Sequence, residues 1–109
     1  MTTKFYVHDL LRNTLPGHDK VWGYCSTKTW PDHRDPIFVF YGATGKSLTF
    51  KQHEYGTKLA ELVNSKIRKG YDIIDDLHSI DTLYPDFQEQ ATDKLPMVIL
   101  SQDKYKAAE

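Results

Sequence analysis

The sequence predicts an α+β domain: an antiparallel sheet of four to five strands, one long helix packed across it, and an acidic C-terminal extension. Short aromatic and β-branched runs separated by Gly and Pro are typical of sheet strands. An amphipathic stretch ending at Gly70 has the period of a helix. The length of 109 residues is that of one domain, spanning residues 1–109.

The first two strands are expected at Lys4–Leu11 and Lys20–Thr27. Pro16-Gly17 lies between them and indicates a turn. Gly23, inside the second run, indicates a bulge or a close approach of another backbone. Residues 29–36 hold two prolines and three charged residues, so they are expected to form a loop.

The central stretch is expected to form a hairpin followed by the long helix. Ile37–Tyr41 and Ser47–Phe50 are the two strands, and Gly42 and Gly45 bracket the turn between them. The helix is placed to begin within a few residues of Gln52 and to end at a left-handed cap. Its apolar stripe consists of Tyr55, Leu59, Leu62, Val63 and Ile67. Its last turn carries Lys66, Arg68 and Lys69, which complement the helix dipole.

After the helix, Tyr71–Ile74 is expected to continue as a short strand or an extended link. Asp75–Thr82 is compatible with one helical turn. Pro85 suits the first position of a further short helix over Phe87–Thr92. Leu95–Leu100 is the most apolar run of this part of the chain and is predicted to be a last strand.

Residues 19–74 contain a recognisable order of motifs. Trp22 stands on an early strand, a Gly turn begins at Tyr41, Phe50 ends the next strand, and Lys66–Tyr71 closes the helix with Lys-x-x-x-Gly-Tyr. This order resembles the WGR domain, a small module of poly(ADP-ribose) polymerases and some bacterial proteins. The chain diverges from that family at the name-giving turn, where Tyr41 replaces Trp and Ala43 replaces Arg. The resemblance implies a WGR-like core over residues 19–74, an extension over residues 75–109, and contact with nucleic acid or a neighbouring domain.

Charge is distributed unevenly along the chain. Residues 1–70 have a balance of +5 and residues 71–109 a balance of −6, which together give the net charge of −1. The basic part favours a polyanion as partner, while the acidic part repels one or covers the basic part. The alternative is that the two oppositely charged parts attract each other within one fold.

Composition restricts the compartment and the chemistry. Cys25 is the single cysteine, which excludes an intramolecular disulfide and a zinc framework, and a reducing cytoplasm is the expected location. No signal-peptide pattern or membrane-length apolar run is present, so no membrane association is expected. Gly42–Ser47 lacks the spacing of a phosphate loop, and the five histidines form no metal motif. We therefore expect a non-catalytic protein without catalytic residues, metal or cofactor.

The expected function is a small binding module. Cations and aromatic residues gather in two predicted loops, at Lys28, Trp30, Arg34, Tyr41 and Lys46. Lysines neutralise phosphates and aromatic rings stack on bases, so these residues are the candidate nucleic-acid or partner-binding surface. DNA is the favoured ligand. The alternative function is a protein-interaction module, a small inhibitor or regulator that docks on a larger partner, with these lysines as ordinary surface residues beside core aromatics.

Overall fold

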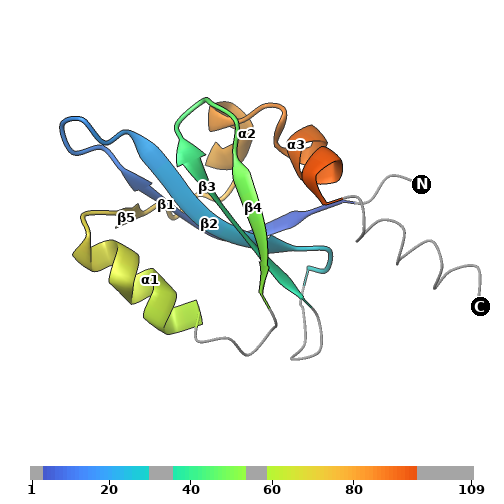
Figure 1. Ribbon diagram of the computed structural model, residues 1–109, viewed down its shortest axis with the longest axis horizontal. Helices are drawn as coiled ribbons and strands as arrows, with labels where there is room; N and C mark the ends of the chain where they lie inside the picture. The colour runs from blue at the N-terminus through green and yellow to red at the C-terminus, as the bar shows by residue number, and fades with distance from the viewer. Residues whose placement is uncertain (1–3, 30–35, 54–58, 96–109) are drawn as a thin grey trace, which may run out of the picture.

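The computed structural model describes residues 4–29, 36–53 and 59–95, which form a five-stranded antiparallel sheet with short helices on its two faces (Figure 1). The strand order is β4-β3-β2-β1-β5. The α+β class and the antiparallel sheet predicted from the sequence are confirmed. The strands are β1 (Tyr6–Asn13), β2 (Lys20–Ser26), β3 (Ile37–Ala43), β4 (Thr49–His53) and β5 (Asp72–Ile73), and the helices are α1 (Leu59–Arg68), α2 (Ser79–Leu83) and α3 (Phe87–Lys94).

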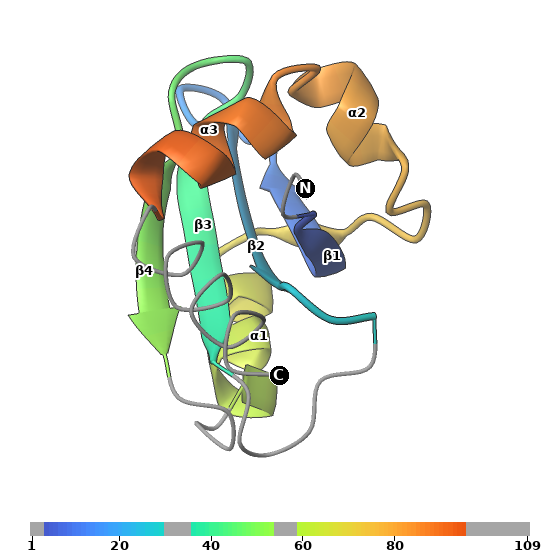
Figure 2. The same cartoon turned by 90° about the vertical axis from the view of Figure 1, so that its right-hand side faces the viewer.

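Both faces of the sheet are apolar, because successive residues of β2 and β3 point to opposite sides. On one face, called the α3 face, strand residues pack against α2 and α3. On the other, called the α1 face, a smaller cluster packs against α1. Figure 2 shows α3 in front of the sheet and α1 behind it. The buried members are Phe5, Leu10, Val21, Cys25, Phe38, Phe40, Leu48, Ile80, Tyr84, Phe87 and Ala91 on the α3 face, and Leu11, Trp22, Val39 and Tyr71 on the α1 face.

The acidic segment that follows β5 is built into the larger core. The ring of Phe87 packs edge-on against Phe40 with 5.0 Å between centroids. The Tyr84 hydroxyl donates a hydrogen bond of 2.6 Å to the carbonyl of Ala43. The side chain of Gln88 binds both the N–H and the carbonyl of Phe5. Residues 79–95 therefore cover the α3 face and not the α1 face.

The expected close approach at Gly23 is confirmed. A Cβ placed there would lie 2.6 Å from Cζ of Phe40 and still closer to the carbonyl oxygen of Asp9. The irregularity of the pairing lies in the neighbouring strand, where the register of β1 shifts between Val7 and Asp9. Glycine in β2 thus lets the bulged strand and an aromatic ring approach the same point.

The structure corrects the start and the length of the main helix. Gln52 and His53 belong to β4, where they pair with Phe38 and Ile37. Pairing of β4 with Ile37–Tyr41 of β3 outweighs the helical pattern there, because tertiary contacts override local propensity. The described helix α1 has ten residues, so the described part of the chain shows no long helix across the sheet. Within the apolar stripe, Leu62 and Val63 are half-buried and Ile67 is 41% exposed, while Tyr55 lies outside the described residues.

Smaller differences concern the C-terminal part. Pro85 precedes α3 instead of occupying its first position, because Asp86 is the N-cap residue. Leu95, where the last strand was predicted to begin, follows α3 and packs against the larger core. The rest of that predicted strand, residues 96–100, lies outside the described residues.

Candidate anion-binding site

The end of α1 is fixed by a left-handed cap. Gly70 has a φ of +100°, as the sequence predicted for the cap position. The N–H of Tyr71 donates to the carbonyl of Lys66 at 3.1 Å, and the N–H of Gly70 donates to the carbonyl of Ile67 at 3.0 Å. These two bonds form a Schellman motif, which satisfies carbonyls that would otherwise present negative partial charge to a ligand.

Asn13, at the end of β1, joins the β1–β2 hairpin to this cap. Its Nδ2 donates to the carbonyl of Lys69 at 3.4 Å, and its Oδ1 accepts from the N–H of Leu15 at 3.0 Å. Asn13 is only 4% exposed, so its side chain is a fixed part of the structure. The hairpin and the end of α1 are therefore held beside each other on the α1 face.

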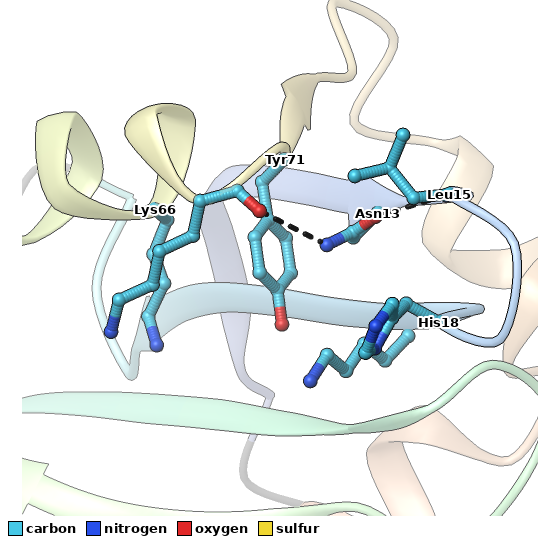
Figure 3. Close-up of a pocket in the computed structure, with 7 residues that line it drawn as sticks. Asn13, Leu15, His18, Lys66 and Tyr71 are labelled. Atoms are coloured by element: carbon cyan, nitrogen blue, oxygen red, sulfur yellow. Dashed lines mark hydrogen bonds between the residues drawn. The ribbon is translucent and has the colours of Figure 1, made fainter.

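A pocket of about 250 Å³ opens between the hairpin and the end of α1 (Figure 3). Its lining is mainly basic and polar, and no carboxylate contributes to it. In the view of Figure 3, the ring of Tyr71 lies between Lys66 and His18. The lining residues are Asn13, Leu15, His18, Lys20, Lys66, Lys69 and Tyr71.

Lys69 and Lys20 lie close enough to Lys66 for their positive charges to act on it. Burial is the main cause that lowers the pKa of Lys66, and the charges of Lys69 and Lys20 lower it further. Among the described residues, none of the three makes an ion pair, since the salt bridge found there joins Arg12 to Asp19. A cluster of like charges without counter-charge costs free energy that a bound anion would recover.

Asp19 directly precedes the pocket residue Lys20 in the sequence, but its carboxylate already binds other side chains. It accepts hydrogen bonds from Nε of Arg12 at 3.0 Å and from the hydroxyl of Thr44 at 2.8 Å. The Arg12 hydrogen bond is the main cause that lowers the pKa of Asp19, which keeps this carboxylate ionised and paired. Lys20, the next residue in the chain, therefore makes no ion pair with Asp19 and lines the pocket.

Tyr71 supplies a hydrogen-bond donor inside the pocket. Its side chain is buried, with 7% exposure, and burial raises the pKa of its hydroxyl. Nζ of Lys66 lies 5.8 Å from the centre of its ring. Within the described part of the chain, the Tyr71 hydroxyl has no hydrogen-bond partner, so it can donate to a ligand.

The structure separates the residues that the sequence singled out for binding. Lys28 follows β2, whereas Lys46 follows β3, and the six paired positions between these strands place the two lysines at opposite ends of the sheet. About 20 Å of strand lies between them. Tyr41 is half-buried on the α1 face, with Nζ of Lys51 5.8 Å from its ring centre. Trp30 and Arg34 lie outside the described residues.

Sequence reasoning missed the pocket, although it noted several of its residues. The sequence pattern explains Lys66 and Lys69 by the helix dipole and Tyr71 by the closing motif. The signal that pointed to a site was the dense run of cations before Gly70 and Tyr71. Placing Lys20 beside them required the order of the strands.

Outside the pocket, His8 and Ser26 form a polar pair. The pair resembles a catalytic serine with a histidine as its general base, but its role is structural. Nε2 of His8 lies 2.7 Å from Oγ of Ser26. The Ser26 hydroxyl donates to the carbonyl of Lys28 at 2.8 Å and is fully buried. A catalytic serine needs its oxygen exposed and its proton directed to the base. Ser26 meets neither condition and instead holds the chain after β2 in place.

Other chemistry finds little support in the described residues. They contain no group of three or more His, Cys, Asp or Glu side chains placed to hold a metal ion. Burial raises the pKa of the Cys25 thiol, which disfavours the reactive thiolate. No described helix is both long and apolar enough to cross a membrane.

Comparisons with protein-family models, with curated proteins and with solved structures find no match.

Proposed function

We propose that this protein is a non-catalytic, WGR-like module that binds nucleic acid through the basic end of its α1 face. The observation that supports this most directly is the pocket of Lys20, Lys66 and Lys69, in which three lysines meet without a carboxylate. Phosphate groups of a nucleic-acid backbone are the common cellular ligands for such a surface. A cytoplasmic location, expected from the single Cys25, is part of the same proposal.

The arrangement of the acidic segment also supports this function. The described residues from α2 to α3 pack on the α3 face, away from the pocket. The described acidic helices α2 and α3 therefore lie on the face of the sheet opposite the pocket. The basic face stays accessible to a polyanion without displacement of the described acidic helices.

Fluorescence anisotropy with labelled single-stranded DNA, double-stranded DNA and RNA, at two salt concentrations, tests the proposal. Lysine contacts to phosphate predict modest, sequence-independent affinity that falls steeply with salt. The double variant Lys20→Gln with Lys69→Gln removes two of these charges, so the slope of log K against log salt should decrease by about two. Absence of binding to all three nucleic acids at low salt would contradict the proposal.

Lys28→Gln is the control, because it removes one lysine charge at the opposite end of the sheet, and the single variants Lys20→Gln and Lys69→Gln match it in charge. If the pocket is the contact, this variant binds as the parent does. If instead Lys28→Gln weakens binding while the pocket variants do not, the contact lies at the end of the sheet that holds Lys28 and not at the pocket.

A protein-interaction module is the second candidate function. Three large apolar side chains are exposed near α1 and the hairpin: Leu15 at 51%, Ile67 at 41% and Ile73 at 50%. Exposed apolar residues of this kind are common where a protein docks on a partner. Loss of binding to a purified partner on Ile73→Ser, with nucleic-acid binding absent in the parent, would favour this function.

A further inference from the structure

We propose that the pocket between the hairpin and α1 also binds a short polyphosphate chain, such as the tail of a nucleoside triphosphate, as a discrete small ligand. This inference concerns the same lysines as the proposed function but does not require nucleic-acid binding. It depends on the charge, the size and the hydrogen-bond donors of the pocket.

The charge of the pocket favours a ligand with several negative charges close together. Lys20, Lys66 and Lys69 line one pocket, and none makes an ion pair among the described residues. A single phosphomonoester carries about −1.5 to −2 charges at neutral pH and cannot balance all three lysines. A chain of linked phosphates presents more charge within one pocket, and each ammonium group can then bind an ionised oxygen at short range.

The size of the pocket limits what enters it. Its volume of about 250 Å³ lies below the range of about 300–1,000 Å³ that is usual for drug-sized ligands. At about 30 Å³ for each water molecule, it corresponds to roughly eight waters, which suits a phosphate chain. A nucleoside attached to that chain would remain outside the pocket.

The fixed donors of the pocket complete the argument. The Tyr71 hydroxyl lacks a partner among the described residues and can donate to a phosphate oxygen. The amide of Asn13 uses one hydrogen for the carbonyl of Lys69, and its second hydrogen is a further donor. Both side chains are almost fully buried, so little conformational freedom is lost when they bind a ligand.

Isothermal titration calorimetry of the full chain without metal tests the inference, with sodium tripolyphosphate as the probe. Orthophosphate and citrate are the comparison anions, one with a single phosphate and the other with three carboxylates. We expect tripolyphosphate to bind at least about tenfold tighter than either, which is the preference that a shaped multi-lysine site should give. Equal affinities for tripolyphosphate and citrate would overturn the proposal, because they would indicate charge attraction without a shaped site.

Variants locate the binding. Lys20→Gln with Lys69→Gln should weaken tripolyphosphate binding at least about tenfold, and Lys28→Gln should leave it unchanged. Tyr71→Phe removes the hydroxyl and keeps the ring under Lys66, so it should weaken binding severalfold without unfolding the domain, as checked by circular dichroism. Parent-like affinity in the double lysine variant would overturn the proposal. So would an equal loss of affinity in Lys28→Gln.

Two further measurements complete the test. One compares ATP with tripolyphosphate to identify the part of the ligand that binds, and the other distinguishes this inference from the proposed function. If ATP and tripolyphosphate bind equally, the phosphate chain is the whole ligand, and if ATP binds tighter, the nucleoside adds contacts at the rim. Tripolyphosphate binding in a protein that ignores oligonucleotides would support this inference and contradict the proposed function. The opposite result is an oligonucleotide that binds and is not displaced by tripolyphosphate, together with no calorimetric signal for tripolyphosphate. That result would support the proposed function and contradict this inference.

Discussion

Gly23 of β2 lies where an added methyl group has no room, and Gly23→Ala should therefore destabilise the domain strongly. Its Cβ would overlap Cζ of Phe40 at 2.6 Å and the backbone carbonyl of Asp9 more closely still. A ring can rotate away at modest cost, but the carbonyl belongs to the bulged part of β1 and is fixed by the sheet. Overpacking of a core costs about 1–3 kcal/mol, and a backbone clash places this site at the upper end.

A loss of about 3 kcal/mol corresponds to a fall in melting temperature of roughly 10–20 °C for a domain of this size. Urea denaturation followed by tryptophan fluorescence and circular dichroism measures the loss directly. Gly45→Ala is the control: Gly45 has open space around it and a φ of +79°, so its variant should lose only about 1–2 kcal/mol from backbone strain.

The double variant Gly23→Ala with Phe40→Leu, measured against Phe40→Leu alone, tests the cause. In the Phe40→Leu background Gly23→Ala should cost less than it does in the parent, but it should still destabilise the domain because the clash with Asp9 remains. A loss below about half a kcal/mol in Gly23→Ala would show that β1 and β2 separate easily at the bulge, and it would refute the reasoning.

Three further predictions concern the cap, the main helix and pH. Gly70→Val should cost about 2–3 kcal/mol in urea denaturation, because Gly70 has a φ of +100° and a Cβ there would lie 2.6 Å from Cδ1 of Leu15. Leu62→Ala should cost about 1–2 kcal/mol, less than a fully buried leucine, since Leu62 is half-buried; no loss would mean that α1 does not pack on the sheet. Burial lowers the pKa of His8 below its ordinary 6.5, so the unfolded chain binds the proton first. Stability should therefore fall as the pH drops below 6.5, and less so in His8→Asn.

The sequence predicted those features that depend on neighbours along the chain. The strands of the first two hairpins, the left-handed cap at Gly70 and the short helix after Pro85 all appear, with ends shifted by a few residues. The close approach at Gly23 was also predictable, since a glycine inside a strand, here between Trp22 and Tyr24, commonly marks a bulge or a close backbone contact. Local chemistry dominates at the strands of the hairpins, at the cap and at the short helix.

Features that depend on pairing between strands were not predictable in the same way. Gln52 and His53 fit the start of a helix, yet β3 offers Phe38 and Ile37 as partners, and the strand continues. The separation of Lys28 from Lys46 follows from the antiparallel pairing of β2 with β3. Two loops that follow consecutive strands of a hairpin lie at opposite ends of the sheet. The single surface predicted from the sequence therefore combines residues that the fold keeps apart.

The basic pocket depends on both kinds of information. Cations in the last turn of a helix usually complement the negative end of its dipole. Here the Schellman bonds and Asn13 already satisfy carbonyls of Lys66, Ile67 and Lys69, so the lysine side chains need not do so. The strand order then brings Lys20 to the same place, which creates a repulsion that local sequence cannot reveal.

This repulsion gives a last prediction, on ligand-dependent stability. A ligand at about 100 times its dissociation constant stabilises the native state by about 2.7 kcal/mol, so tripolyphosphate should raise the melting temperature of the parent by roughly 10–15 °C. Sodium chloride at the same ionic strength only screens the lysines and should raise it by much less. Lys20→Gln with Lys69→Gln should lose the tripolyphosphate increment and keep a small response to chloride. Equal increments from the two salts in the parent would mean that the lysines are screened without a bound ligand, because site-specific binding requires tripolyphosphate to exceed chloride.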